Sequence, residues 1–82
     1  MNEKQYHTVN VIDFRSTNHQ TTFVKVEGYD AELEREFEGE IKFVNGMPFG
    51  DLIHPQRSFL SASCRQHVRD KLLNKYSSGE FE

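Results

Sequence analysis

Cysteine and long apolar runs are what this sequence most clearly lacks. The 82 residues include one cysteine, Cys64, so an internal disulfide is excluded, and a single thiol cannot form a zinc site alone. One free thiol fits a reducing compartment such as the cytosol. The first residues, Met-Asn-Glu-Lys-Gln-Tyr, lack the apolar run of a signal peptide. No stretch approaches the roughly 18–20 apolar residues of a membrane span. We therefore expect a cytoplasmic, soluble protein with no membrane partner.

The short length sets a second limit. The 82 residues allow one domain, 1–82, with residues 1–5 and 77–82 expected as loose ends. A chain this short buries only about 60–65% of its unfolded surface, which leaves no room for an enclosed substrate cavity beside a full core. The sequence also has no internal repeat and no glycine-rich phosphate loop. We therefore expect a non-enzymatic protein with no catalytic residues and no cofactor.

A row of glutamates is the most informative feature that is present. The side chains of a strand alternate between its two faces, and here every second residue of one segment is a glutamate. In an extended conformation these carboxylates would share one face, about 6.6 Å apart, while Leu33, Phe37, Ile41 and Phe43 share the other. Such a row is unusual, because like charges on one sheet face repel each other. The row consists of Glu32, Glu34, Glu36, Glu38 and Glu40.

Two features leave the conformation of this segment open. Gly39 lies inside the predicted strand 33–44, and glycine there indicates a bulge or a bend. A bulge would take Glu40 off the row. Alanine, leucine, glutamate and arginine are also good helix formers, so residues 30–38 could instead form a short helix. We favour the strand because the run 37–44 is typical of one. A helix would scatter the glutamates around its axis.

Two further strands are predicted before the glutamates. The segments 6–15 and 21–27 are rich in β-branched and aromatic residues, which suit a half-buried pleated surface. A polar loop with Asn18 as its turn residue joins them as a hairpin. Gly28-Tyr29-Asp30 is expected to separate the second strand from the third.

An amphipathic helix is predicted at the C-terminal end. Ser63 with Gln66 three residues later matches a capping box, although Ser58 or Ser61 would give an earlier start. Gly79 is expected to end the helix in a left-handed conformation. Apolar residues recur at four-residue spacing, which gives one stripe for burial. The stripe consists of Leu60, Cys64, Val68, Leu72 and Tyr76.

The segment between the third strand and the helix begins with a turn. Asn45-Gly46 is the strongest turn signal in the chain. Residues 47–51 are expected to continue it as a loop, and residues 52–54 to form a short fourth strand or a single turn. The order of elements predicts an α+β fold, in which a three-stranded or four-stranded antiparallel β-meander packs against one C-terminal amphipathic helix.

Charge is divided between two segments, although the net charge is only −3. Residues 27–40 hold seven acidic residues against Arg35, whereas residues 54–76 hold five basic residues against Asp70. This asymmetry indicates either two complementary faces within the domain or an electrostatically steered partner. The acidic balance argues against general nucleic-acid binding, which usually needs a strongly basic domain.

The glutamate row favours a protein-interaction module. We expect an inhibitor or adaptor that binds a basic, nucleic-acid-handling protein, a task common among small phage or bacterial accessory proteins. The alternative is an ordinary solvated strand face, with Lys25, Lys42 or the basic helix as counter-charges. Two apolar residues after the Asn45 turn either add an aromatic anchor or fold back over the core. The predicted partner-binding residues are Glu32, Glu34, Glu36, Glu38, Glu40, Met47 and Phe49.

Nucleic-acid binding through the helix is the alternative function. Its basic side chains would contact phosphates, although one helix cannot form a helix-turn-helix. A third hypothesis is self-association of the acidic strand with the basic helix. The residues predicted for phosphate contact are Arg65, Arg69, Lys71 and Lys75.

The histidines and the cysteine predict no metal site and no nucleophile. Zinc needs three or four converging ligands, and only Cys64 and His67 share a helix face. Because Cys64 lies on the apolar stripe, we expect a buried structural thiol. The other histidines, His7, His19 and His54, are scattered along the sequence.

Overall fold

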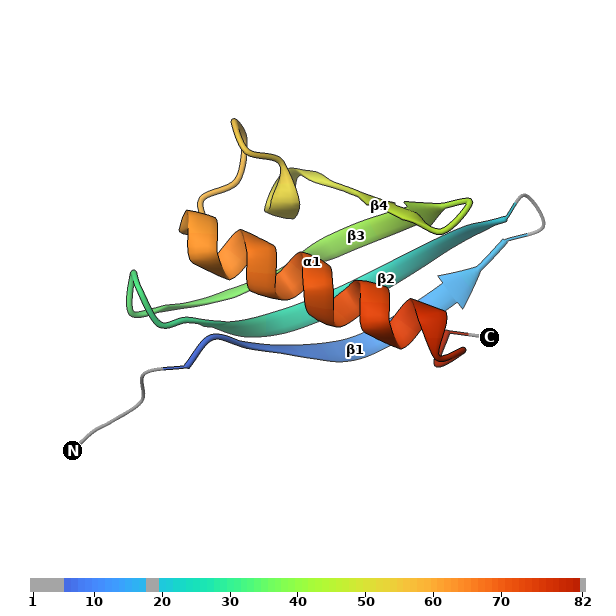
Figure 1. Cartoon of the computed structure of the whole chain (residues 1–82), viewed down its shortest axis with the longest axis horizontal. Helices are drawn as coiled ribbons and strands as arrows, with labels where there is room; N and C mark the ends of the chain where they lie inside the picture. Colours follow the sequence, from blue (N-terminus) through green and yellow to red (C-terminus); the bar gives the residue numbers. More distant parts are fainter. Residues whose placement is uncertain (1–5, 18–19, 82) are drawn as a thin grey trace.

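The computed structural model describes residues 6–17 and 20–81 and shows a four-stranded antiparallel sheet with one helix across one face (Figure 1). The strands lie in the order β1-β2-β3-β4, so each pairs with its neighbour in sequence. The predicted α+β fold, a meander packed against one C-terminal helix, is confirmed. The elements are β1 Thr8–Ser16, β2 Thr21–Asp30, β3 Arg35–Val44, β4 Met47–Phe49, the 3₁₀ turn η1 Asp51–Ile53 and α1 Ala62–Ser77.

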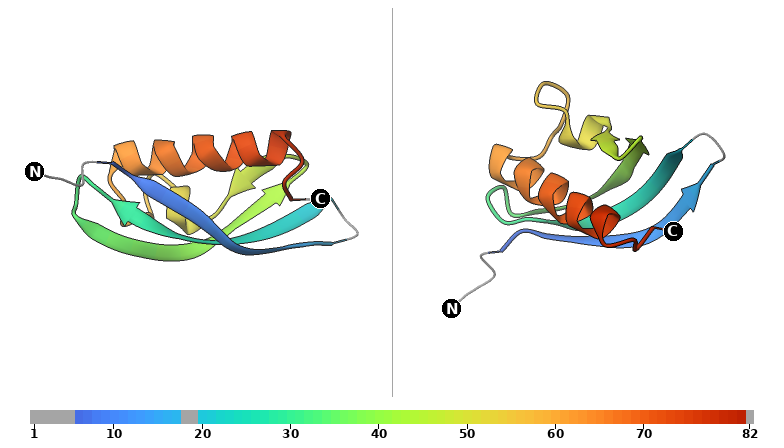
Figure 2. Two further views of the ribbon diagram at one scale, coloured as in Figure 1. Left: turned by 90° about the horizontal axis from the view of Figure 1, so that it is seen from below. Right: turned by 45° about the vertical axis from the view of Figure 1, so that its right-hand side comes forward.

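The core lies between α1 and the inner face of the sheet (Figure 2). Along β2, Thr22, Val24 and Val26 are buried while the residues between them face outward, as strand alternation requires. The predicted helix stripe is confirmed, because Cys64, Val68 and Leu72 are buried, as is Leu60 before the helix, and Tyr76 packs against the core. Each large apolar side chain buried here contributes roughly 1.5–3 kcal/mol.

The turn between β2 and β3 lies later than predicted. Gly28-Tyr29-Asp30 does not interrupt the chain, since β2 runs through these residues and the turn occupies residues 31–34. The predicted strand start at Leu33 and the helical alternative for residues 30–38 are both wrong. Leu33 is exposed in the turn, because the chain reverses there before β3 begins at Arg35.

The irregularity in the sheet lies in β1. Pairing of β2 with β3 is continuous through Gly39, so the predicted bulge there is wrong. The register shift falls instead between Val11 and Asp13. Gly39 instead lies close to Leu52, where a Cβ atom would make a tight contact of 3.3 Å with the Leu52 side chain.

The Asn45-Gly46 turn is confirmed. Both residues have positive φ, 53° and 85°, as a two-residue hairpin of this type requires. The loop predicted for residues 47–51 is wrong at its start, because Met47–Phe49 pairs with the end of β3 as β4. Of the alternatives for residues 52–54, the single turn is closer, since η1 ends at Ile53.

The N-cap of α1 falls at one of the alternative positions, and its C-terminal end lies as predicted. The N-cap is Ser61 rather than Ser63, and its hydroxyl accepts a hydrogen bond from the Cys64 N–H. Gly79, with φ 82°, follows the last turn as expected. The predicted loose end 77–82 is wrong for Phe81, which is 4% exposed and packs in the core. The predicted turn residue Asn18 and the loose end 1–5 lie outside the described residues.

Candidate functional site

The outer face of the sheet carries most of the acidic row. On β3, Glu36, Glu38 and Glu40 are exposed and alternate with buried or half-buried residues. The register of the sheet places Glu27 of β2 directly opposite Glu38. Directly opposite side chains have Cβ atoms about 4.5–5.5 Å apart, where like charges destabilise the sheet. We call these four residues, Glu27, Glu36, Glu38 and Glu40, the acidic face.

Two of the five glutamates in the predicted row lie elsewhere. Glu32 and Glu34 belong to the turn before β3, and Glu34 has a positive φ of 57°. The Glu32 carboxylate accepts a hydrogen bond from the Ser63 hydroxyl at 2.6 Å. The prediction of five carboxylates on one face is therefore wrong. Sequence spacing also missed Glu27, because only strand pairing brings it beside the row.

The basic helix supplies no counter-charge to the acidic face. α1 covers the opposite side of the sheet (Figure 2). On the outer face, Lys25 lies directly opposite Glu40, and Lys42 follows on β3. In the part of the chain that the structure describes, no ion pair involves a carboxylate of the acidic face. The repulsion between these carboxylates is thus only partly offset by the two lysines.

A shallow hollow adjoins the acidic face. It has a volume of about 470 Å³ and is lined by Glu27, Glu36, Phe37, Glu38 and Phe59. Phe59 lies in the loop before α1 and is 55% exposed. An aromatic ring beside three carboxylates offers both an apolar wall and negative charge. This combination suits the long cationic side chain of lysine or arginine.

The other end of the outer face is more apolar. Met47 of β4 lies opposite Val44, and Phe49 lies opposite Lys42. The two β4 side chains are 51% and 52% exposed, so of the two alternatives for this segment exposure is confirmed. They share the outer face with the glutamates, because Phe49 pairs with Lys42, and Lys42 points to the same side of β3 as Glu38. Lys42 and Glu38 are four residues apart along the strand, which is about 13 Å. A partner could therefore contact charge and apolar surface together.

The basic residues of α1 do not form one surface. Arg69 and Lys71 are separated by roughly 160° around the helix axis, given 3.6 residues per turn. The Arg65 guanidinium donates to a backbone carbonyl of the preceding loop at 3.3 Å. Lys75 forms an ion pair with Glu80 at 3.3 Å. The helix thus presents its positive charge on two flanks rather than as a single phosphate-binding stripe.

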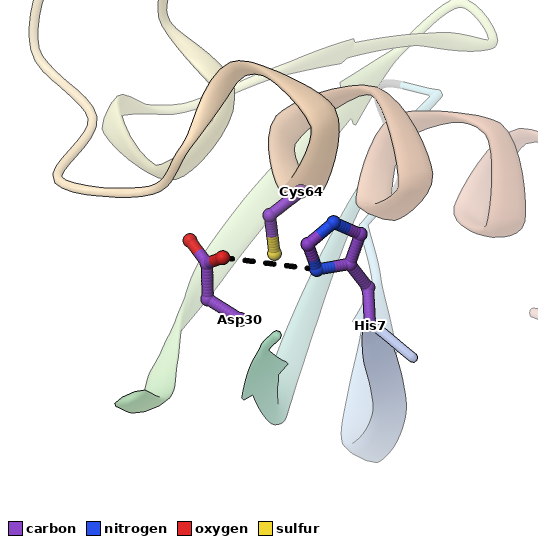
Figure 3. Close-up of side chains that lie close together, drawn as sticks. All are labelled: His7, Asp30 and Cys64. Atoms are coloured by element: carbon purple, nitrogen blue, oxygen red, sulfur yellow. Dashed lines mark ion pairs between the residues drawn. The ribbon is translucent and has the colours of Figure 1, made fainter. Parts of the chain in front are cut away.

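A second group of chemically active side chains lies beneath the first turn of α1 (Figure 3). His7 precedes β1, Asp30 ends β2 and Cys64 belongs to α1. His7 Nδ1 lies 3.7 Å from Asp30 Oδ1. Sequence spacing does not predict this group, because on one helix face Cys64 is paired only with His67. The β1–β2 pairing that places His7 near Asp30 has no local sequence signal.

Asp30 is almost fully buried but accepts four hydrogen bonds. Ser61 donates to it from its backbone N–H at 2.7 Å and from its hydroxyl at 2.8 Å. The N–H groups of Glu32 and Leu33 donate at 3.1 and 3.2 Å. Burial raises the pKa of Asp30, but these hydrogen bonds outweigh burial and the net pKa is lowered. Asp30 is therefore a carboxylate at neutral pH.

The neighbouring Cys64 thiol carries no charge at neutral pH. Burial, and then the charge of Asp30, raise the pKa of Cys64 to about 12. The expected buried thiol is therefore confirmed. Burial also lowers the pKa of His67, whose ring lies 5.9 Å from that of His7, and the nearby His7 and Lys71 lower it further.

Comparisons with known proteins assign the chain to no family. No known protein family, no curated protein and no solved structure matches it. Within residues 6–17 and 20–81, no helix is long and apolar enough to cross a membrane. The class that the fold and the surface define is a four-stranded α+β domain with an acidic sheet face.

Proposed function

We propose that this protein is a non-enzymatic interaction module that binds a basic partner protein through the outer face of its sheet. The observation that carries the proposal is the Glu27–Glu38 pair, directly opposite across two strands and flanked by Glu36 and Glu40. This arrangement costs stability in the isolated domain. A cationic partner would neutralise the repulsion between these carboxylates, so binding such a partner explains why the arrangement is present.

The apolar end of the face completes the proposed interface. Exposed Met47 and Phe49 supply surface that gains energy when water is excluded, and such residues are enriched at interface centres. The carboxylates supply attraction over a longer range and select for positive charge. An inhibitor or adaptor of a nucleic-acid-handling protein in the cytoplasm fits these requirements, because such proteins carry basic surfaces.

Capture of partners from a bacterial lysate tests the proposal. The tagged chain is incubated with lysate, with and without nuclease, and the retained proteins are eluted with salt and identified. We expect a defined basic protein that survives nuclease treatment. The triple variant Glu27→Lys, Glu36→Lys and Glu38→Lys should lose it.

A matched variant controls for the change in net charge. Glu34→Lys, Asp51→Lys and Asp70→Lys together add the same charge, and all three positions are exposed away from the acidic face. This variant should retain the captured partner. Equal loss in both triple variants, or retention in both, would contradict binding through the acidic face.

Nucleic-acid binding through α1 is the second candidate, and the excess of basic residues in 54–76 favours it. Arg65, Arg69, Lys71 and Lys75 would then contact phosphates. This candidate predicts affinity that falls steeply with salt concentration. Absence of nucleic-acid binding at low salt, measured by fluorescence anisotropy with a labelled duplex and a labelled single strand, would exclude it.

A further inference from the structure

Three side chains of the kinds that bind metal ions converge beneath the first turn of α1. His7, Asp30 and Cys64 come from three separate segments, and one ligand atom from each lies within 4.8 Å of the other two. In Figure 3 the Cys64 sulfur lies between the Asp30 carboxylate and the His7 ring. Asp30 and Cys64 are buried, and the His7 side chain is 17% exposed. This site lies on the helix side of the sheet, so it is independent of the acidic face.

We propose that His7, Asp30 and Cys64 bind one divalent cation of the zinc class. Imidazole nitrogen, carboxylate oxygen and thiolate sulfur are all zinc ligands, and bonds of about 2.0–2.3 Å place tetrahedral ligand atoms roughly 3.3–3.8 Å apart. The 3.7 Å between His7 Nδ1 and Asp30 Oδ1 already falls in this range. The thiol gives its proton to solvent as the metal–sulfur bond forms. Thiolate and carboxylate then balance the two positive charges, and water takes the fourth position.

The surroundings of His7 prepare its ring for this role. Nε2 lies 2.9 Å from the Ser63 hydroxyl oxygen, and that hydroxyl donates to Glu32 at 2.6 Å. Because the Ser63 proton is directed to Glu32, the Ser63 oxygen accepts from Nε2–H, which leaves the lone pair on Nδ1. Metal-binding histidines usually donate their second ring N–H to an oxygen acceptor, which fixes the tautomer and the ring orientation.

Metal binding replaces hydrogen bonds of the structure. The Ala31 N–H donates to His7 Nδ1 at 3.0 Å, and the cation would take the lone pair that this bond uses. At Asp30, the oxygen near His7 is Oδ1, which accepts from the Ser61 hydroxyl and from the N–H groups of Glu32 and Leu33. The cation would displace one of these three donors from Oδ1, while the Ser61 N–H keeps its bond to Oδ2. The bound ion would join the segments around β1, β2 and α1, and it should therefore raise the stability of the fold.

Titration with cobalt(II) chloride tests the site, because cobalt replaces zinc and absorbs light. The full chain is reduced and titrated without oxygen. We expect a thiolate-to-cobalt charge-transfer band that saturates at one equivalent and disappears when zinc is added. The melting temperature, followed by circular dichroism, should rise with either metal. A folded chain that shows no charge-transfer band would overturn the proposal.

Variants separate this site from adventitious binding. His7→Gln and Cys64→Ala should abolish the charge-transfer band, and Ser63→Ala should weaken cobalt binding roughly 10–100-fold. His54→Gln, an exposed histidine outside the cluster, is the matched control and should bind cobalt like the wild type. His7→Gln decides the test if Cys64→Ala fails to fold, since His7 lies outside the hydrophobic core. An unchanged band in a folded His7→Gln variant would exclude the site.

Discussion

Reversal of one charge on the acidic face should stabilise the protein and weaken partner binding at the same time. Glu27 faces Glu38 directly, and Glu36 and Glu40 lie on the two diagonals. Glu27→Lys therefore changes three repulsive contacts into attractive ones without touching the core. A stabilising substitution that removes function is the expected signature of a surface arranged for binding.

The size of the stabilisation follows from the strand geometry. The direct contact spans about 5 Å and each diagonal about 7–8 Å. In water with 0.15 M salt, the direct repulsion costs about 0.4 kcal/mol and each diagonal about 0.2 kcal/mol. Charge reversal gains about twice their total. The lost attraction to Lys25 and the new repulsion from it together subtract about 0.5 kcal/mol. The net gain is about 1 kcal/mol, which raises the melting temperature of a domain this size by about 4–8 °C.

Thermal unfolding at two salt concentrations measures this gain. In 1 M salt the gain should shrink to about a third, because the screening length falls to about 3 Å. Glu34→Lys, the same change in the turn before β3, is the control and should shift the melting temperature by no more than about 2–4 °C. A Glu27→Lys protein with an unchanged or lower melting temperature at low salt would refute the reasoning from strand pairing.

Three further predictions concern the parts of the fold that support the two sites. Asp30→Asn should lower the free energy of unfolding in urea by about 2–3 kcal/mol near neutral pH. Because folding lowers the Asp30 pKa, its stabilisation is complete above the unfolded pKa of about 3.9 and disappears as the pH falls through the folded pKa. A difference between the two proteins that stays constant down to pH 2 would contradict this. Gly28→Ala should cost about 1–3 kcal/mol, because its Cβ would overlap the Thr8 carbonyl oxygen and lie 2.6 Å from the Phe37 ring; an unfolding midpoint equal to that of the wild type would show that the strands can separate freely there. Phe81→Ala should cost about 3–5 kcal/mol by the same assay, since Phe81 is 4% exposed, whereas a loose C-terminal end predicts no change.

The features that the sequence predicted correctly are the local ones. Residues spaced four apart between Leu60 and Tyr76 share one side of a helix regardless of the tertiary structure, so the sequence alone predicts the buried stripe. Alternation on β3 placed Glu36, Glu38 and Glu40 on one face for the same reason. The Asn45-Gly46 turn depends on the backbone preferences of its own two residues.

The features that were missed depend on contacts between distant segments. Asp30 marks the β2–β3 turn because its side chain accepts the N–H groups of the two turn residues Glu32 and Leu33, yet its sequence position alone placed the break too early. Glu27 joins the acidic face only through the β2–β3 register. The approach of His7 to Cys64 likewise requires the folded arrangement of the sheet and α1. The periodicity of a single segment does not predict which distant residues will be paired with it.

The charged and apolar ends of the outer face would serve different steps of binding. The cost of the acidic face, about 1 kcal/mol, is small against the 5–15 kcal/mol stability of a typical domain, so the fold tolerates it. Exposed carboxylates are screened by salt and mainly accelerate the encounter with a positive partner. Met47 and Phe49 are each about half exposed. Their burial would instead lengthen the lifetime of the complex, because apolar surface is removed from water only after the two proteins have docked. An acidic face without that apolar end would attract many basic proteins and retain few. Within the described residues, both ends lie on one exposed sheet face, which favours a specific partner over general solubility as the reason for the charge pattern.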